Sequence, residues 1–219
     1  MCKPTRENAN KVLDALEEEH PDATIYLEYE DALDLLIRTI LAAQCTDEKV
    51  NEVAPKLWDK YPTPEDIAEA DRGDLEDILH PTGFYRRKSK SVQNCCRDLV
   101  QKHGGDVPDN LDELTDLAGV GRKTANVVLA NAMGQQAIPV DTHVKRVSRR
   151  IGLAAKKSAD AIERELQEVI PKDRWTRSTQ LMGTHGRRIC TSRNPSCPDC
   201  PISQWCDYYE EHKDEFQET

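Results

Sequence analysis

The chain's 219 residues allow one large domain or two small ones with a buried core, although only 37% of them are hydrophobic. Aromatic residues, at 5%, are too scarce for a protein that stacks single strands on aromatic side chains, and the net charge of −10 gives no general affinity for polyanions. The sequence starts without a signal-peptide pattern and contains no apolar run of membrane length, so we expect a soluble, cytoplasmic protein with no membrane partner.

Apolar residues recur at helical spacing along the chain, and no segment alternates as a strand would, so the sequence predicts an all-α protein. A polar helix is expected over residues 5–20. A central, mostly buried helix is expected over residues 31–44, whose sequence DALDLLIRTILAAQ is apolar nearly all round. Apolar residues at helical spacing over residues 50–58 predict the next helix. Thr63 and Pro64 then begin another, because a hydroxyl cap and a first-position proline precede two acids at the positive end of the dipole.

The second half of the chain continues in the same way. A further helix precedes the sequence HPTGFYRRK, whose glycine-bearing turn leads into a basic helix. A short helix over residues 111–117 leads into LAGVG, and a helix over residues 122–133 follows, ended by Gly134. Residues 159–170 predict one more amphipathic helix, which Pro171 closes.

Positive charge is concentrated in two segments of this acidic chain. Residues 141–193 contain 13 Lys and Arg against 6 Asp and Glu, and residues 81–103 contain 6 against 1, which leaves −22 on the rest. Binding to phosphates depends on the contacting face and not on the total charge. The two segments therefore indicate a local polyanion contact as readily as they indicate ordinary solvated helix faces.

Residues 117–130 read LAGVGRKTANVVLA, which places a Gly-Val-Gly turn between two helices. Gly119 and Gly121 permit backbone conformations that a Cβ would oppose and let the main chain approach a ligand closely. The N–H groups that begin the second helix then point at a bound anion, and the helix dipole assists them. Together with Val120 and Arg122, these features indicate a site that binds one phosphate of a nucleic-acid backbone. The alternative, which two glycines alone would favour, is a tight helix–helix turn with no ligand.

The longer stretch LAGVGRKTANVVLANAMGQQAIPVDTH resembles the helix–hairpin–helix and Gly-Pro-Asp region of the endonuclease III DNA glycosylases. The resemblance extends from DALDLLIRTILAAQCTD to the C-terminal cysteines. The family usually has proline where this chain has Ala118, a change that removes no donor needed by the phosphate. The resemblance implies two helical domains with a DNA-binding groove between them. One is expected over residues 24–135, and the other is expected to combine residues 1–23 with residues 136–219.

In that family the lysine matching Lys123 is the nucleophile and the aspartate matching Asp141 is its partner. An uncharged amine attacks the sugar C1′, displaces the damaged base and stays attached as a Schiff base, after which β-elimination cleaves the strand. A buried setting near other cations would keep the amine uncharged, and a carboxylate would stabilise positive charge on the sugar. Taken alone, Lys123 would be a phosphate contact beside Arg122 and Asp141 a helix cap, which is compatible with catalysis.

A base inside a duplex must be swung out of the stack to reach such an amine, and a side chain fills the gap that it leaves. The resemblance assigns this role to Gln44 in the AAQCTD turn and to Phe84 in the PTGFYRRK turn, where many relatives carry an aliphatic residue. Arg86, Arg87 and Lys88 are then expected to contact phosphates beside the wedge. The alternatives are a Phe84 ring packed under its own turn and a Gln44 that is only the polar end of its helix.

Half of the eight cysteines lie in the segment RICTSRNPSCPDCPISQWC. They are Cys190, Cys197, Cys200 and Cys206, spaced C-x6-C-x2-C-x5-C. Zinc ribbons and fingers usually offer paired short knuckles, whereas a single C-x2-C occurs here, and a reducing cytosol disfavours disulfides. Ligation by thiolates at this spacing suits a [4Fe–4S] cluster and matches the family's iron–sulfur loop. The resemblance implies a cluster that cross-links the loop and presents Arg187, Arg188 and Arg193 to the DNA backbone.

The resemblance thus predicts a DNA glycosylase and AP lyase for oxidised pyrimidines, acting as a monomer on duplex DNA with damaged pyrimidines or abasic sites in a prokaryotic cytoplasm. A second possibility within the same superfamily is an adenine- or thymine-mismatch glycosylase, but those relatives commonly lack lysine at the position of Lys123. A third is a DNA-binding or scaffold module without catalysis. That module would explain the glycines and the basic segments, but it leaves the pairing of Lys123 with Asp141 as coincidence.

Overall fold

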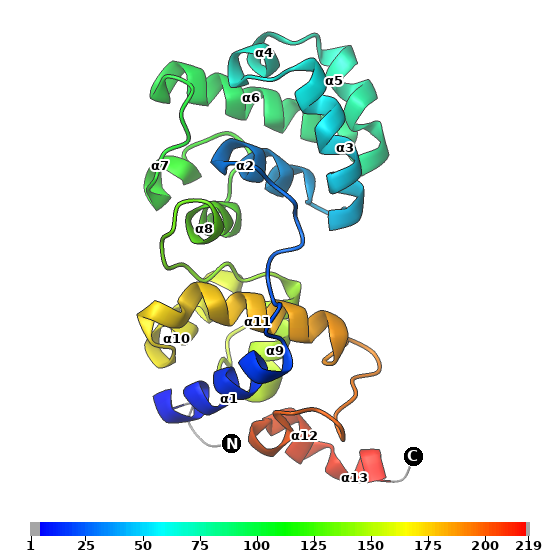
Figure 1. The fold of residues 1–219 in the computed structure, drawn as a ribbon, viewed down its shortest axis with the longest axis vertical. Coiled ribbons are helices and arrows are strands. Elements are labelled where there is room, and N and C mark those ends of the chain that lie inside the picture. The colour runs from blue at the N-terminus through cyan, green and yellow to red at the C-terminus, as the bar shows by residue number, and fades with distance from the viewer. Residues whose placement is uncertain (1–4, 218–219) are drawn as a thin grey trace. The chain divides into compact units, whose positions relative to one another are not determined.

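A computed structural model describes residues 5–217 of the protein. This range consists of helices joined by short connections and contains no strand, which confirms the all-α prediction. The helices form two compact units, one comprising Met1–Ile25 and Gln135–Thr219 and the other Tyr26–Gly134 (Figure 1). None of the helices in the described range is long and apolar enough to cross a membrane.

The unit Tyr26–Gly134 is built around α2 (Ala32–Leu41), in which every residue from Asp34 onward is buried. Two of these residues are charged, and Arg38 Nε donates to Asp34 Oδ1 at 2.6 Å. Trp58 Nε1 donates to the same oxygen at 2.5 Å, so the buried ion pair is also hydrogen-bonded to a neighbouring helix. The other helices of the unit are α3 (Asp47–Lys60), α4 (Pro64–Glu69), α5 (Arg72–Leu79), the 3₁₀ turn η1 (His80–Thr82), α6 (Tyr85–His103), α7 (Leu111–Thr115) and α8 (Arg122–Asn131).

Local signals set most helix boundaries in this unit. Thr63 forms the expected cap of α4 within a full capping box, because Thr63 Oγ1 accepts from Asp66 N while Asp66 Oδ2 accepts from Thr63 N. The central helix α2 ends at Leu41, earlier than residue 44, because the chain turns at Gln44 into the left-handed region, with φ 53°. A turn of that kind ends an α-helix.

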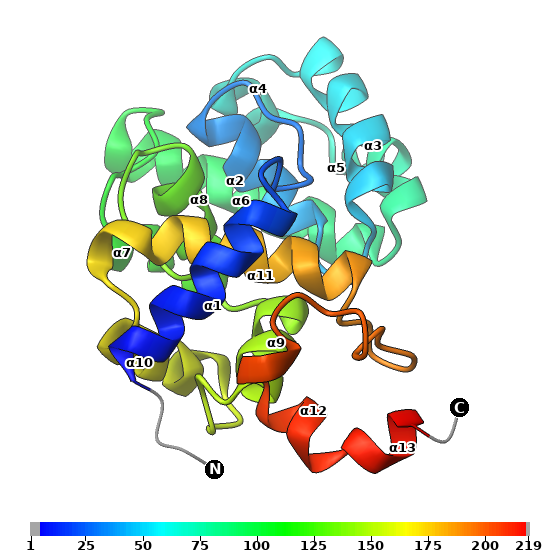
Figure 2. The same cartoon turned by 60° about the horizontal axis from the view of Figure 1, so that its bottom comes forward.

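The second unit has a single apolar core, formed mainly by α1, α9, α10 and α11. Helix α1 packs on α10 and α11, and α9 packs along α11 (Figure 2). A Cβ added to Gly186 would lie 3.0 Å from His143 Cβ, so α9 and α11 approach closely at this glycine. The helices of this unit are α1 (Arg6–Glu19), α9 (Thr142–Ile151), α10 (Ala159–Val169), η2 (Lys172–Arg174), α11 (Trp175–Arg188), η3 (Ser203–Trp205), α12 (Asp207–Glu211) and α13 (Lys213–Gln217).

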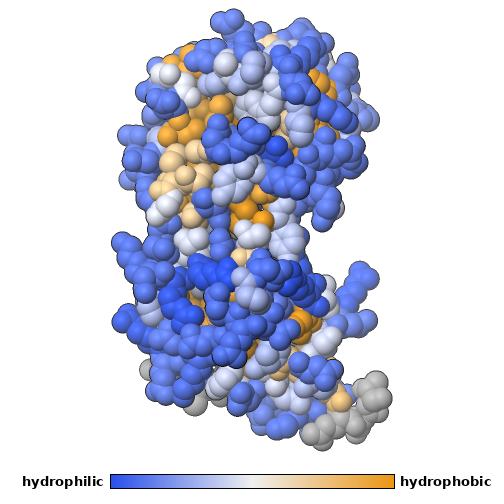
Figure 3. Space-filling view, viewed as in Figure 1, coloured by the Kyte–Doolittle hydropathy of each residue, from blue (hydrophilic) through white to orange (hydrophobic). Residues whose placement is uncertain are grey.

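Part of the positive charge in residues 141–193 serves the fold of this unit. Arg177 donates to Glu17 of α1 at 2.6 Å, and Arg174 donates to Asp14 at 2.7 Å. These arginines hold α1 against α11, so the segment offers less charge to a polyanion than its composition implies. Hydrophilic residues cover most of the face seen in Figure 3.

Candidate nucleic-acid interface and metal centre

The Gly-Val-Gly turn between α7 and α8 is fixed against α6. Gly119 has φ +81°, and a Cβ added there would lie 2.8 Å from Ser91 Cβ, so only glycine fits without a shift. The Ala118 N–H donates to Asp98 Oδ2 at 2.9 Å, a bond that the proline usual in the family cannot make. Val120 is buried, with 6% of its surface exposed. The turn is therefore rigid before any ligand arrives.

The start of α8 is open, in contrast to the packed Gly119. Gly121 is the N-cap residue, and a Cβ added there would meet nothing within 4 Å. No side-chain hydrogen bond caps the start of this helix, and Gly121 leaves the space beside it clear. The helix dipole makes this end favourable for an anion, and Arg122 adds a positive charge.

The two residues expected to be catalytic belong to different compact units. Lys123 is the second residue of α8, and it is exposed. Asp141 is half-buried and forms the predicted cap of α9, since its Oδ1 accepts from Val144 N at 2.7 Å. That bond fixes the direction of the carboxylate.

The first turns of α9 connect Asp141 to the cysteine segment. Arg146 Nε donates to the Cys190 carbonyl at 2.9 Å, and its Nη2 donates to the Gly186 carbonyl at 2.6 Å. The same Nη2 lies 3.1 Å from His143 Nδ1. Burial lowers the pKa of His143, with Arg187 and Arg146 adding to the effect and Asp141 opposing it. The sequence analysis did not identify Arg146, because nothing in its local pattern separates it from other surface arginines.

Two turns of the unit Tyr26–Gly134 carry the residues expected to fill a gap in the DNA stack. Gln44 (φ 53°) and Phe84 (φ 47°) are the only described residues other than glycine with positive φ. Such a conformation is strained for these residues and is often found at functional sites. Phe84 has 63% of its surface exposed, so the alternative of a ring packed under its own turn is wrong. Gln44 is exposed as well.

The three basic residues after Phe84 fall into two groups. Arg86 and Arg87 are exposed, and Arg86 lies 3.7 Å from Glu76. Lys88 is buried at 4% exposure, and its Nζ donates to the Thr82 carbonyl at 2.7 Å. The expectation of a phosphate contact at Lys88 is therefore wrong. One helical turn after Phe84, the side chain points back under the turn and holds its backbone.

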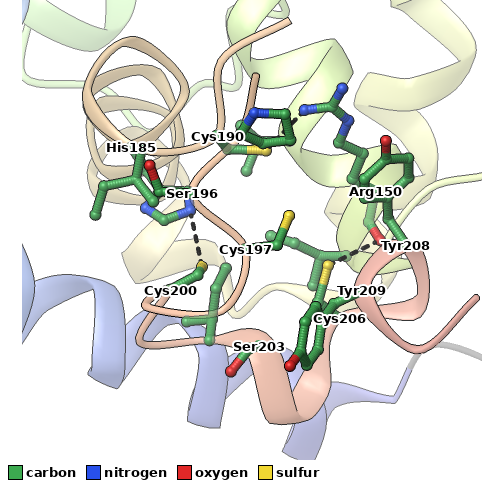
Figure 4. Close-up of a pocket in the computed structure, with 15 residues that line it drawn as sticks. Arg150, His185, Cys190, Ser196, Cys197, Cys200, Ser203, Cys206, Tyr208 and Tyr209 are labelled. Carbon is green, nitrogen blue, oxygen red and sulfur yellow. Dashed lines mark hydrogen bonds between the residues drawn. The ribbon is translucent and has the colours of Figure 1, made fainter. Parts of the chain in front are cut away.

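The C-terminal cysteines surround one cavity. Cys190, Cys197, Cys200 and Cys206 all line it (Figure 4). Arg150 Nη1 donates to Cys190 Sγ at 3.3 Å. Burial raises the pKa of Cys197 to about 11 and that of Cys200 to about 12, so these thiols are protonated until a cation binds. Among the described residues, no three His, Cys, Asp or Glu side chains are grouped to hold a single metal ion.

Two buried histidines, His185 and His20, contact each other beside the same cavity. His185 Nε2 lies 3.5 Å from Cys200 Sγ, and His185 Nδ1 lies 3.2 Å from His20 Nε2. Burial, assisted by His20, lowers the pKa of His185 to about 4. The two histidines are 165 residues apart in the chain, so no local pattern could have indicated their contact.

The arginines near the cysteines have different surroundings. Arg188 binds Asp22 with both terminal nitrogens, at 2.9 and 2.7 Å, and holds the pKa of that carboxyl at about 2. Arg187 and Arg193 are exposed, Arg187 at the end of α11 and Arg193 within the loop. Arg150, which also donates to the Thr191 and Ser192 carbonyls, holds that loop against α9.

Comparison with known proteins gives concordant matches. The HhH-GPD superfamily of base excision DNA repair proteins matches residues 37–172. Endonuclease III of Synechocystis is 44% identical over 202 residues, which cover 92% of this chain and 92% of that protein. Endonuclease III of Haemophilus influenzae is 40% identical over 200 residues, covering 91% of this chain and 95% of that protein.

Solved structures agree with these relatives. A trapped covalent intermediate of an endonuclease III with DNA superposes with a TM-score of 0.91 at 40% identity, covering 95% of this chain and 99% of that one. A non-covalent endonuclease III–DNA complex gives a TM-score of 0.91 at 39% identity, covering 96% and 99%. A thermostable thymine-DNA glycosylase, 24% identical with a TM-score of 0.82, shares the fold.

Proposed function

Because the chain belongs to the endonuclease III family of helix–hairpin–helix base-excision DNA repair proteins, we propose that Lys123 is its nucleophile and Asp141 the assisting carboxylate. Membership of this family makes the chain a DNA glycosylase with AP lyase activity. The observation that carries the residue assignment is the position of Lys123. It stands in the first turn of the uncapped helix α8, directly after the rigid Gly-Val-Gly turn.

The turn and the helix start hold one phosphate of the DNA backbone. Gly119 fixes the turn on α6, and Gly121 leaves room for the phosphate beside the first N–H groups of α8. Val120 and Arg122 complete this grip. Binding here positions the strand and reads no base, which suits an enzyme that must examine every sequence. Arg86, Arg87, Arg187 and Arg193 are exposed and supply further phosphate contacts.

The reaction begins when the neutral Nζ of Lys123 attacks the sugar C1′. The bond from C1′ to the base nitrogen breaks, its electron pair leaves with the base, and the base takes up a proton. The bound nitrogen gives up one proton, and its lone pair then breaks the bond from C1′ to the ring oxygen, which takes up a proton; the product is the iminium form of a Schiff base. That iminium acidifies the C2′ proton, whose removal expels the 3′ phosphate and cleaves the strand. Water then hydrolyses the imine and releases Lys123.

Asp141 acts on charge and protons in this sequence. Positive charge develops on the sugar as the base departs, and a fixed carboxylate stabilises that charge. The same oxygens accept protons from the amine during the later steps. The hydrogen bond from Val144 N holds the carboxylate in one direction, so little free energy is needed to reorient the carboxylate during the reaction.

Gln44 and Phe84 occupy the space that the extruded nucleotide leaves. Both are exposed on turns with a left-handed backbone, which project the side chains while the supporting helices stay packed. The glutamine amide hydrogen-bonds the orphaned base, and the phenyl ring wedges into the stack. The preferred substrates are oxidised pyrimidines and abasic sites in duplex DNA, and the enzyme acts as a monomer in a prokaryotic cytoplasm.

The C-terminal cavity holds a [4Fe–4S] cluster, with Cys190, Cys197, Cys200 and Cys206 as ligands. Four thiolates that line one space would suit such a cluster, and these four side chains lie around one cavity in Figure 4. The guanidinium of Arg150 lies beside Cys190 Sγ and offsets negative charge on the ligands. When bound, the cluster supplies folding energy by cross-linking the loop.

Borohydride trapping on abasic duplex DNA tests the nucleophile. Borohydride reduces the iminium and leaves protein and DNA joined, so the unmodified protein should give an adduct on a denaturing gel. Lys123→Ala should give none. Asp141→Asn should still give the adduct, at a rate lower by at least roughly a hundredfold, because it removes the charge and keeps the cap. Lys11→Ala, an exposed lysine of α1, is the matched control and should react as the unmodified protein does.

The same assay on three duplexes separates the candidate substrates. Thymine glycol, an abasic site and a mismatched pair are offered in parallel. Release of the oxidised base together with strand cleavage supports the proposal. Release from the mismatch alone would instead support a mismatch glycosylase. An unmodified protein that binds abasic DNA without forming an adduct would be a binding module, and the assignment of Lys123 would then be wrong.

A further inference from the structure

A line of three side chains runs from the N-terminal helix to one cysteine of the cavity. His20, the C-cap residue of α1, contacts His185 of α11, and His185 contacts Cys200. Both histidines are buried, at 2% and 1% exposure. Figure 4 shows the ring of His185 directed at the Cys200 sulfur. The metal-binding role proposed above does not use either histidine.

The chemistry of a bound thiolate fixes the direction of these hydrogen bonds. A thiolate that ligates iron has no proton and can only accept, so His185 Nε2 must carry the hydrogen that lies toward Cys200. An imidazole whose one hydrogen is on Nε2 can only accept at Nδ1, so the contact of His185 Nδ1 with His20 Nε2 takes its hydrogen from His20. One ligand thus sets the tautomer of both rings.

We propose that His185 is a positioning residue that donates a hydrogen bond to the Cys200 thiolate, and that His20 orients it by donating to its other nitrogen. This inference rests on the proposed cluster. Side chains that hydrogen-bond to the ligands of a metal centre orient those ligands and tune the centre. Hydrogen bonds to the ligand sulfurs also help to set the reduction potential of an iron–sulfur cluster. The pair therefore makes the properties of the cluster depend on α1, at the far end of the sequence.

Ring-nitrogen NMR on the unmodified holoprotein tests the tautomers without any substitution. With ¹⁵N-labelled histidine, His185 should show a protonated Nε2 and an unprotonated Nδ1, and His20 a protonated Nε2. A hydrogen on Nδ1 of His185 would overturn the proposal, because its Nε2 would then have none to donate to Cys200.

Substitutions at the two histidines test the effect on the cluster. His185→Phe keeps a ring in the buried space and removes the donor, so reduction, which adds negative charge, should become less favourable. We expect a shift of about tenfold in the reduction equilibrium, which is about 59 mV for a one-electron couple, measured by protein-film voltammetry. His185→Gln, which restores an N–H near the position of Nε2, should recover most of the shift. His20→Phe should give a smaller shift in the same direction.

Controls separate failure of this inference from failure of the proposed cofactor. His103→Phe, a histidine of α6 in the other unit, should leave the potential unchanged. Iron and sulfide analysis comes first, and an unmodified protein with neither would overturn the cofactor and this inference together. A protein that holds the cluster but keeps its potential in His185→Phe would overturn the inference alone. If His185→Phe does not retain the cluster, the NMR measurement decides.

Discussion

The Gly-Val-Gly turn and the cysteine loop are both short connecting segments, yet they are held in different ways. The turn is anchored by its own unit, since Val120 is buried, Gly119 packs on Ser91 and Ala118 N–H binds Asp98. The loop from Cys190 to Cys206 buries Cys197 and Ile202, and two arginines of α9 bind its carbonyls. The turn therefore holds its conformation without a ligand, whereas the conformation of the loop depends on what its cysteines bind.

This difference indicates where rigidity is supplied in each unit. A phosphate grip must exist before DNA arrives, so it is built from the backbone and a packed core. A loop too polar to form a core can be ordered by ligation instead, because the binding energy of metal to thiolates then becomes folding energy. The predictions that follow test this contrast, from the largest expected effect to the smallest.

Loss of one cluster ligand should have the largest effect. Cys197→Ser removes a buried ligand, so we expect a colourless protein in which the cysteine loop is unfolded. Structural zinc sites typically bind their metal with a free energy on the order of 10 kcal/mol. A cluster with a similar structural role should contribute a comparable free energy to folding, which the variant would lose. Hydrogen exchange should show lost protection near the loop and retained protection in the unit Tyr26–Gly134.

Cys45→Ser is the matched control for this prediction. Cys45 is a half-buried cysteine of the unit Tyr26–Gly134. The Cys45→Ser protein should keep both its colour and an ordered cysteine loop. A Cys197→Ser protein that keeps both an ordered loop and full activity would show that the loop folds without its ligand. The contrast between the two segments would then be wrong.

The two glycines of the turn should separate stability from binding. Gly119→Ala places a Cβ 2.8 Å from Ser91 Cβ at positive φ, so we expect a loss of about 1–3 kcal/mol in the free energy of unfolding. Gly121→Ala meets no neighbour and should change stability by less than about 0.5 kcal/mol. It should instead weaken binding to abasic duplex roughly tenfold, the value of one charge-assisted hydrogen bond.

Denaturant unfolding and fluorescence anisotropy at fixed salt measure these two effects, and each glycine variant is the control for the other. If Gly121→Ala bound DNA as tightly as the unmodified protein, the open start of α8 would not be the phosphate site. If Gly119→Ala were as stable, the turn would not be fixed by its packing on α6.

Sequence patterns predicted the parts of these segments that depend on local chemistry. Helical spacing predicted most of the helices, though not α11 or the short helices after it, and Thr63 and Asp141 are the caps that their residue types indicate. The spacing of the C-terminal cysteines indicated ligands for one centre, and all four side chains line one cavity. Each of these features is determined by residues a few positions apart.

Features that depend on tertiary packing were beyond the sequence. Lys88 follows two arginines and looks like them, but its position one turn after Phe84 turns the amine inward to a carbonyl. The contact of His20 with His185 joins helices at opposite ends of the chain. The exposure of Lys123 at the start of α8 is likewise not indicated by its sequence pattern.

Lys88 and Arg87 offer a test with opposite results at neighbouring positions. Lys88→Met keeps the buried stem and leaves the Thr82 carbonyl without its donor, so we expect a loss of about 1–2 kcal/mol in the free energy of unfolding. Arg87→Ala should leave stability within about 0.5 kcal/mol and lower the slope of log K against log salt by about 1.

Lys90→Met is the control for Lys88, because Lys90 is exposed two residues later in α6. It should unfold with the same free energy as the unmodified protein. A Lys88→Met protein with unchanged stability and a smaller salt slope would restore the phosphate role to Lys88. The buried amine would then not be what holds this turn.

No loss of stability is expected at Phe84, where strain and function coincide. An exposed ring on a left-handed backbone contributes little packing, and that conformation costs a residue with a Cβ about 1–2 kcal/mol. Phe84→Gly should therefore be as stable as the unmodified protein or more stable by up to about 1 kcal/mol, while base excision slows because the wedge is absent. Phe84→Leu should retain most of the excision rate, because it keeps an apolar side chain on the same strained turn. If Phe84→Gly excised the base at an undiminished rate, the strain at this turn would have no part in opening the duplex. The self-contained rigidity of the unit Tyr26–Gly134 would then serve the phosphate grip alone.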